Sequence, residues 1–212
     1  MLSFFSAKGG AGCSVVAAGC ALLSARDQQT LLVDLNGDLP DVLGLEPAEP
    51  SRQGVGDWLG ATAPLPDTLR RLEVRVGDSL ALLPTGETGP GFRPEQWRVL
   101  AHLLASEGRR VVIDVGHWVQ PPLPVLSASD RTVLVTRACY LALRAAARSP
   151  GPDDIVLVSE PGRALGPNEV GSYLGVDIGA VVKWDPAVAR AVDAGLLAGR
   201  LPRSLRSLGT LL

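Results

Sequence analysis

The chain has 212 residues, a formal net charge of −2, 46% hydrophobic residues and 20% charged residues. These values fit one ordinary globular domain over residues 1–212 and exclude nucleic-acid binding by the whole surface. The sequence contains neither a run of about 18 apolar residues nor a basic leader with a small-residue cleavage site, so we expect a cytoplasmic protein. Cys13, Cys20 and Cys139 form no Cys-x-x-Cys pair, which argues against a disulfide framework or a cysteine metal site.

Short apolar runs recur along the chain and are mostly continuous, which is typical of strands covered on both faces. They predict strands at 2–6, 30–34, 80–84, 110–115, 132–136, 155–159 and 178–182. Helical spacing between them predicts helices at 14–25, 94–106, 139–148, 167–174 and 186–194. This alternation predicts an α/β fold, a mainly parallel twisted sheet with helices on both faces. The stretches 46–67 and 85–94, rich in Pro and Gly, are predicted to be surface excursions.

The first predicted strand ends in a glycine-rich loop, residues 6–14, that runs directly into the first predicted helix. Ligands of open parallel sheets bind beyond the carboxyl ends of the strands. Glycines let successive amides turn toward an anion, and the following helix adds its positive end. The loop therefore predicts a phosphate site; the alternative is a plain glycine turn.

The loop resembles that of the MinD/ParA family of deviant Walker ATPases, which reads Lys-Gly-Gly-x-Gly-Lys-Ser/Thr. The resemblance implies a P-loop NTPase-like three-layer sandwich with ATP and Mg²⁺ as cofactors. It makes Lys8 the signature lysine, with a role in catalysis, and Ser14 a magnesium ligand. The nucleotide-binding residues that it implies are Lys8, Gly9, Gly10, Ala11, Gly12, Cys13 and Ser14.

Two positions depart from the family pattern. Cys13 stands where the second lysine should be, and a thiol supplies no fixed positive charge to a phosphoryl transition state. After the second predicted strand, Asp34 keeps a carboxylate near the metal, whereas Asn36 replaces the aspartate that orients the attacking water. An amide hydrogen-bonds water but cannot accept its proton. Asp38 either substitutes for that carboxylate or, as we favour, is the N-cap of a helix at 39–43.

Two further segments resemble the family. The apolar run 110–114 ends in Asp114 and looks like a Walker B strand, in which this carboxylate would act at the magnesium. The segment 182–191 looks like the one that borders the adenine ring, with Asp185 and Pro186 as nucleotide-binding residues. These two residues are also an ordinary helix start. His117 and Trp118 follow the Walker B-like strand; we expect His117 at the surface and assign it no role.

The best match within the family is the pilus-associated CpaE/TadZ branch, which often replaces the second lysine by a small residue, as Cys13 does. That branch commonly has a receiver-like domain before the nucleotide domain, and we expect none here. The resemblance implies a spatial organiser or scaffold in Flp or type IV pilus assembly, or in polar or septal positioning, with weak or no hydrolysis. Two alternatives stay open: an active ParA/MinD-type partitioning or division-site ATPase, and a nucleotide-free structural pseudo-ATPase.

The resemblance also implies a nucleotide-dependent homodimer in which Lys8 reaches the partner's phosphates; the alternative is that Lys8 caps carbonyls of its own loop. The tail 200–212 predicts one apolar helical side, formed by Leu201, Leu205, Leu208 and Leu212. Such a basic amphipathic end can lie at a membrane surface, but Pro202 and Gly209 favour a final helix packed on the core. Its few arginines would bind DNA only weakly, so we expect no DNA partner.

Overall fold

The computed structural model describes residues 1–45, 53–62, 64–86, 92–117 and 121–212. Its strands form one sheet of eight, in the spatial order β3-β4-β2-β5-β1-β6-β7-β8. The strands are β1 (Leu2–Phe5), β2 (Thr30–Asp34), β3 (Val74–Arg75), β4 (Leu80–Leu83), β5 (Arg110–Gly116), β6 (Arg131–Arg137), β7 (Asp154–Ser159) and β8 (Ile178–Lys183). All neighbouring pairs are parallel except β3 with β4. The predicted mainly parallel sheet is confirmed.

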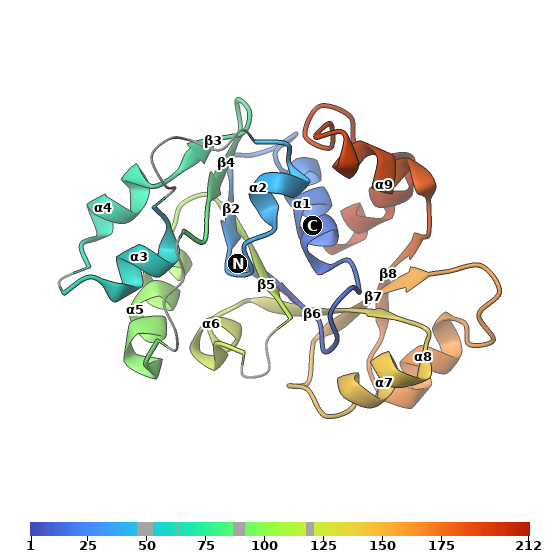
Figure 1. Ribbon diagram of the computed structural model, residues 1–212. Helices are drawn as coiled ribbons and strands as arrows, with labels where there is room; N and C mark the ends of the chain where they lie inside the picture. Colours follow the sequence, from blue (N-terminus) through green and yellow to red (C-terminus); the bar gives the residue numbers. More distant parts are fainter. Residues whose placement is uncertain (46–52, 63, 87–91, 118–120) are drawn as a thin grey trace.

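Helices cover both faces of the sheet (Figure 1). They are α1 (Cys13–Ser24), α2 (Leu39–Val42), α3 (Val55–Gly60), α4 (Pro66–Arg71), α5 (Pro94–Ala105), α6 (Leu123–Ser127), α7 (Tyr140–Ala146), α8 (Pro167–Leu174) and α9 (Pro186–Asp193), with a final 3₁₀ helix, η1 (Arg203–Leu211). The first core packs α1, α2 and η1 on one face, and the second packs α3, α4, α5 and α6 on the other. Within the described residues no helix is long and apolar enough to cross a membrane.

The stretch predicted to be a surface excursion at 46–67 contains a buried helix. In α3, Trp58 and Leu59 are almost fully buried in the second core. Gly54 precedes the helix, and a Cβ there would lie 2.2 Å from the Pro84 carbonyl oxygen, so only glycine permits this approach. The Asp57 carboxylate accepts from the Gly54 amide at 2.8 Å and starts the helix. The residues of the two excursions at 46–52, 63 and 87–91 lie outside the described part.

The tail packs on the core as a 3₁₀ helix rather than an α-helix. With three residues per turn, Leu205, Leu208 and Leu211 form the buried side, and Leu212 is 38% exposed. A different side of the 3₁₀ helix carries hydroxyl groups and faces β8, the strand at the edge of the sheet. Ser207 donates to the Val181 carbonyl at 2.9 Å, and Thr210 donates to the Gly179 carbonyl at 2.7 Å. The tail therefore covers a sheet edge that would otherwise present unpaired groups. The predicted inclusion of Leu212 in the buried side is wrong because the prediction used α-helical spacing.

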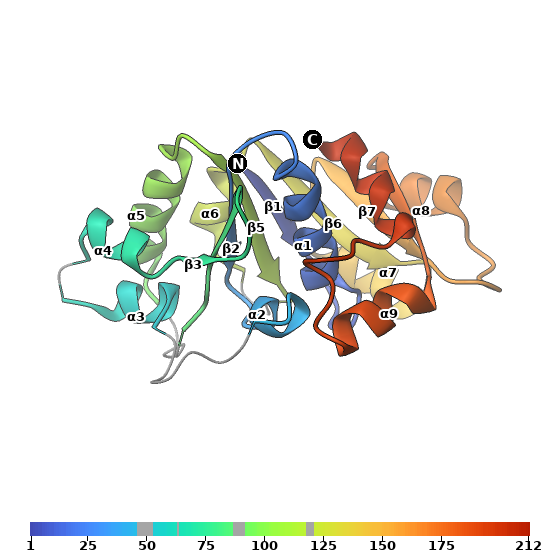
Figure 2. The same ribbon diagram turned by 90° about the horizontal axis from the view of Figure 1, so that it is seen from above.

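Both chain ends lie at the amino ends of the strands, away from the glycine loop. The Met1 amino group pairs with Asp130, and Arg131 donates to the Leu211 carbonyl at 3.2 Å. Figure 2 shows the two ends close together, with α2 at the opposite edge. The carboxyl ends of the parallel strands, where a ligand site is expected, are thus free of the termini.

We predict that Leu208→Ala lowers the free energy of unfolding by about 2–4 kcal/mol, because this side chain is fully buried against α1. The matched control is Leu212→Ala, at the exposed end of the same tail, which should change stability little. Chemical denaturation measures both. Equal, small effects of the two substitutions would contradict the packed tail and favour a membrane-facing one.

Candidate functional site

The glycine loop between β1 and α1 leaves the first turn of α1 open. Gly10 and Gly12 have φ of 76° and 91°, the left-handed region that side chains rarely adopt. Gly12 occupies the N-cap position and has no side chain that could accept the first amides of the helix. Those amides, from Cys13 onward, carry the positive end of a 12-residue helix. The local geometry is therefore suited to an anion.

A cavity of about 1030 Å³ lies in front of this loop, between α2 and the end of α9. The predicted residues that line it are Gly9, Gly10, Ala11, Gly12, Cys13, Ser14, Asn36 and Asp38. Apolar side chains of Val42, Leu45 and Val192 line it as well. The cavity is therefore lined both by polar groups and loop amides and by apolar side chains, as ligand sites commonly are.

Ser14, Asn36 and Asp38 form one polar cluster in the cavity. Asn36 Nδ2 donates to Asp38 Oδ2 at 2.6 Å and to Ser14 Oγ at 3.3 Å, and Ser14 Oγ donates to Asp38 Oδ2 at 3.4 Å. Asp38 stands at the N-cap position of α2, but its side chain caps no amide of that helix. The favoured prediction that Asp38 is the N-cap residue of this helix is therefore confirmed in position, although its side chain makes no capping hydrogen bond. Its carboxylate instead faces the loop hydroxyl and amide.

The side chain that accepts from the first amide of α2 is that of Asp34. Its carboxylate is fully buried and accepts from the amides of Asn36 at 2.9 Å, Gly37 at 2.7 Å and Leu39 at 3.2 Å. Burial raises the pKa of Asp34, and these amides lower it in part. Thr85, which the sequence analysis missed, donates to the Asp34 carbonyl at 2.7 Å. Asp34 thus holds the turn that places Asn36 and Asp38; its role near a metal remains a prediction.

Asp114 pairs with Asp34 in the register of β5 and β2, so two buried carboxylates lie side by side. Asp114 Oδ1 accepts from the Gly116 amide at 3.0 Å, whereas Oδ2 has no hydrogen-bond partner among the described residues. Burial raises the pKa of Asp114 to about 7. The nearby Ser14 hydroxyl opposes this increase in pKa, and the negative charge of Asp34 contributes to it. A buried carboxylate oxygen without a partner is rare and marks a place for a water or a cation.

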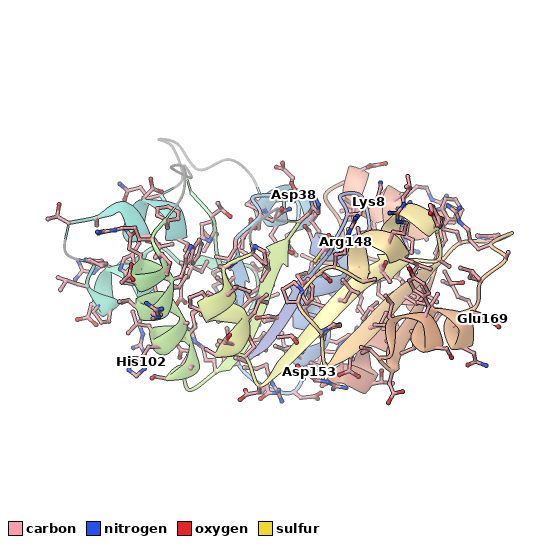
Figure 3. The ribbon with its side chains drawn as sticks, turned by 90° about the horizontal axis from the view of Figure 1, so that it is seen from below. Lys8, Asp38, His102, Arg148, Asp153 and Glu169 are labelled. Carbon is pink, nitrogen blue, oxygen red and sulfur yellow. The ribbon has the colours of Figure 1, made fainter. Side chains whose placement is uncertain are left out.

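Lys8 projects from the loop but does not line the cavity. It is exposed, and within the described residues its ammonium has no ion pair. Figure 3 shows Lys8 at the same end of the sheet as Asp38. The alternative that Lys8 caps carbonyls of its own loop has no support, because no hydrogen bond of its side chain is found among the described residues. Its reach across a dimer interface remains a prediction.

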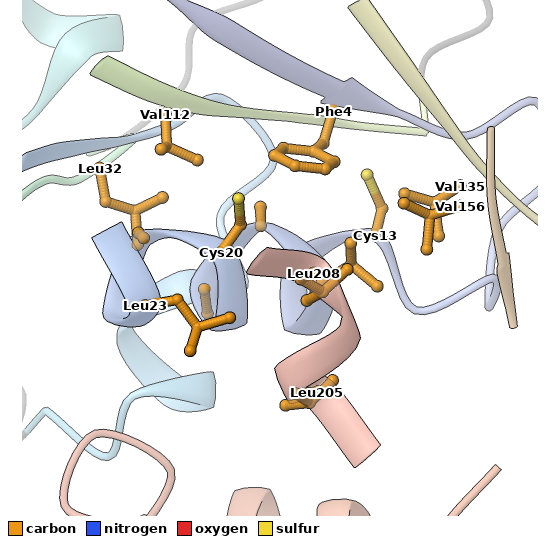
Figure 4. Close-up of a cluster of buried hydrophobic side chains, with 14 of the residues drawn as sticks. Phe4, Cys13, Cys20, Leu23, Leu32, Val112, Val135, Val156, Leu205 and Leu208 are labelled. Carbon is orange, nitrogen blue, oxygen red and sulfur yellow. The ribbon is translucent and has the colours of Figure 1, made fainter. Parts of the chain in front are cut away.

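Cys13 belongs to the core as much as to the loop. Figure 4 shows its sulfur pointing toward Phe4 and Val135, and the residue is only 6% exposed. Burial raises the pKa of the Cys13 thiol well above its usual range, and the charge of Asp114 adds to the increase. The thiol therefore stays neutral and offers no charge to a ligand. All three cysteines are free.

Asp185 and Pro186 start α9, as ordinary helix-start chemistry predicts. Asp185 accepts from the Ala187 amide at 2.8 Å and from the Ser204 hydroxyl at 3.0 Å, so both of its oxygens have partners. Neither Asp185 nor Pro186 lines the cavity. Their contact with a nucleotide remains a prediction, because the cavity is bordered instead by the other end of α9.

Two glycines that the sequence analysis missed bring the carboxyl end of α9 to the cavity. Gly44 and Gly195 have φ of 69° and 64°. A Cβ on Gly44 would lie 2.1 Å from the Gly195 carbonyl oxygen, so the two backbones pass in direct contact. Gly116, with φ of 69°, similarly makes room for the Asn36 side chain, 2.2 Å from where its Cβ would be. Isolated glycines in a sequence do not indicate this role, because the close approach is set by the tertiary fold.

No protein-family model matches the chain, and no curated protein matches its sequence. Solved structures do match. The fold is similar to a ParA family ATPase from Chlorobium tepidum TLS, with a TM-score of 0.77 and 22% identity over 99% of this chain and 97% of that one. It is also similar to the septum site-determining protein MinD, complexed with Mg-ADP, from Pyrococcus horikoshii OT3, with a TM-score of 0.78 and 18% identity over 99% and 93% of the two chains.

A third similar structure is a McdA–ATP complex from Cyanothece, with a TM-score of 0.72 and 15% identity over 99% of this chain and 94% of that one. At these identities the likeness establishes the fold. The predicted P-loop NTPase-like architecture of the MinD and ParA ATPases is confirmed.

We predict that Asp114→Asn stabilises the protein without ligand at pH 8 and has a smaller effect at pH 5. The pKa of Asp114 is about 7 when folded, above the value of about 4 for an unfolded aspartate. Between these values the folded chain holds a proton that the unfolded chain has released, so stability falls as pH rises through this window. Removing the carboxylate should raise the free energy of unfolding at pH 8 by about 1–3 kcal/mol.

Chemical denaturation at the two pH values measures this difference. Asp78→Asn is the control, because the Asp78 side chain is 98% exposed and should respond alike at both pH values. An Asp114→Asn protein less stable than the unmodified one at pH 8 would show that the carboxylate is stabilised rather than strained by its surroundings.

Proposed function

We propose that this chain is a single MinD/ParA-like domain that binds ATP with Mg²⁺ and acts as a spatial organiser or scaffold. One observation carries the proposal: the open amino end of α1 and the Ser14–Asn36–Asp38 cluster face the same cavity, which continues to apolar walls. Amides and a helix end bind phosphates, and apolar walls suit a base. The fold shared with structures described as complexes with ATP and with Mg-ADP supports the same assignment.

Magnesium fits the oxygen atoms at the phosphate end. This ion is bound in nucleotide sites by one or two protein oxygens together with phosphates and waters. The Ser14 hydroxyl and the Asp38 carboxylate lie in the cavity, and the unpartnered Oδ2 of Asp114 is close enough for Ser14 to lower the pKa of that carboxyl. Ser14 would hold the ion, and Asp114 and Asp34 would act near it. When bound, Mg²⁺ would neutralise phosphate charge.

We further propose that hydrolysis is slow or absent. The Cys13 thiol is neutral and packed in the core, so it does not offer the charge that a lysine would place on the phosphates. Asn36 cannot accept a proton from water. Asp38 keeps a second candidate open, an active ParA/MinD-type ATPase, because its carboxylate lies in the cavity within hydrogen-bond distance of both Ser14 and Asn36. A nucleotide-free pseudo-ATPase is the third candidate.

The resemblance to the CpaE/TadZ branch leads us to place this activity in Flp or type IV pilus assembly, or in polar or septal positioning. We propose a cytoplasmic protein, at a pole or at the inner membrane face, that forms a homodimer when nucleotide is bound. The exposed ammonium of Lys8, outside its own cavity, supports a role toward a second subunit.

Our first test of this function compares nucleotide binding with turnover. The unmodified protein should bind fluorescent ATP with Mg²⁺ but release phosphate slowly. The double variant Cys13→Lys with Asn36→Asp restores both altered functions and should raise turnover by about 10- to 1000-fold. Cys13→Ser with Asn36→Asp is the control that restores the carboxylate without the cation, and circular dichroism checks that each variant folds.

Fast phosphate release by the unmodified protein, matching the double variant, would support the active ATPase through Asp38. Failure of the unmodified protein to bind ATP at millimolar concentration would instead support the nucleotide-free pseudo-ATPase. Either result contradicts the proposed slow nucleotide-binding scaffold.

Our second test concerns the dimer. Light scattering should show a monomer without nucleotide and a dimer with ATP and Mg²⁺, and Lys8→Ala should abolish the dimer. The chain has only one other lysine, Lys183, which is exposed at the end of β8, so Lys183→Ala is the matched control. A monomer under both conditions, or equal effects of the two substitutions, would contradict the role proposed for Lys8.

A further inference from the structure

The cavity in front of the glycine loop has an unusual charge for a phosphate site. Among the described residues that line it there is no lysine or arginine, whereas Asp38, Asp41 and Asp193 are present. A magnesium-bound triphosphate still carries net negative charge, and like charges repel across a short distance. The backbone amides of the loop offset part of this repulsion, but the outermost phosphate needs a cation that the cavity itself does not provide.

A second cavity of about 470 Å³ meets the first at the ends of β1 and β5. Ser6, Gly116 and His117 line both cavities. The Ser6 amide donates to the Gly116 carbonyl at 2.8 Å, so the two cavities adjoin at the ends of these two strands. The second cavity extends to α7 on the opposite face of the sheet and contains Arg148 but no acidic side chain among its described lining. The two cavities thus differ in sign of charge.

Arg148 is free to use its charge. It lies two residues beyond the end of α7 and is exposed, and its guanidinium has no ion pair or hydrogen bond among the described residues. Other arginines nearby are engaged: Arg144 lies over the Tyr140 ring and donates to its hydroxyl at 3.3 Å, and Arg137 pairs with Glu160 at 3.0 Å. Figure 3 shows Arg148 at the same end of the sheet as Lys8.

The direction of a bound nucleotide follows from the first cavity. Its apolar walls, at Val42, Leu45 and Val192, suit the base, and the open amides at the start of α1 suit the inner phosphates. The outermost phosphate would then lie beside Gly9 and His117, where a Cβ on Gly9 would be 3.9 Å from His117 Nδ1. This place is also close to the proposed magnesium ligand, because the Asn36 side chain packs against Gly116 and donates to Ser14. The same place adjoins the second cavity, whose lining includes Arg148.

We propose that Arg148 contacts the outermost phosphate of a bound nucleoside triphosphate from the second cavity, and so makes the site prefer triphosphate over diphosphate. Charge-assisted hydrogen bonds from a guanidinium to a phosphate are the strong ones, because the planar fork matches the phosphate oxygens. The residue would supply, from the segment just after α7, positive charge that Cys13 does not. This inference rests on the proposed function, since it requires a nucleotide in the first cavity.

The test is an equilibrium titration with Mg²⁺, using fluorescent ADP and a fluorescent non-hydrolysable ATP analogue. The unmodified protein should prefer the triphosphate. Arg148→Gln should weaken triphosphate binding about tenfold and leave ADP binding unchanged, because ADP lacks the phosphate that Arg148 contacts. Arg144→Gln is the matched control: it removes an arginine one turn earlier on α7 that does not line the second cavity, and it should change neither affinity.

Three results would overturn the inference while the proposed function stands: no change for Arg148→Gln, an equal loss for both nucleotides, or the same loss for Arg144→Gln. The second would mean that Arg148 acts on the general electrostatics of the site. Arg148→Lys keeps the positive charge but loses the planar guanidinium, so it should retain part of the preference for triphosphate over diphosphate. Failure of the unmodified protein to bind either nucleotide would overturn the proposed function, and this inference with it.

Discussion

The open amino end of α1 is the constraint on which the site depends. Gly12, held in the left-handed region, ends the loop without a side chain that could satisfy the first amides of the helix. Helix ends without such partners need water or a ligand, and an anion fits the positive end best. The loop departs from the family pattern at Cys13, but this departure leaves the backbone donors in place, because the thiol turns into the core. Under the proposed function, phosphate binding and phosphate chemistry would therefore be separable.

Two buried carboxylates on neighbouring strands organise the rest. Asp34 and Asp114 face each other in the register of β2 and β5, where burial disfavours the charge of both. Three amides satisfy Asp34, which thereby shapes the turn that carries Asn36 and Asp38. Asp114 keeps one oxygen without a partner. The two carboxylates therefore differ in role: Asp34 fixes the conformation of the turn, whereas Asp114 has an oxygen that could contact a cation or water in the site.

The sequence predicted the sheet well because buried parallel strands are continuous apolar runs, a signal that does not depend on distant contacts. Short elements escaped prediction: α3 has 6 residues and begins after a glycine whose need arises from the backbone of Pro84. The tail was predicted as an α-helix because its leucines fit both the α-helical and the 3₁₀ spacing. The hydroxyl contacts with β8 fit the 3₁₀ spacing. Asp38 occupies the predicted N-cap position, but the Leu39 amide donates to Asp34, five residues earlier, and nothing in the sequence pattern indicates that contact. Contacts such as Gly44 with Gly195 are set by tertiary structure alone.

The central claim is that main-chain amides at the start of α1 can hold a triphosphate although no lysine occupies position 13. A crystal structure determined with ATP and Mg²⁺ tests it most directly. We predict that the inner phosphates lie on the amides of the loop and of the first turn of α1, with magnesium at Ser14 and the Cys13 thiol still packed against Phe4. A structure at saturating ATP in which the loop binds no phosphate, or binds it only after the Cys13 side chain has left the core, would contradict the account.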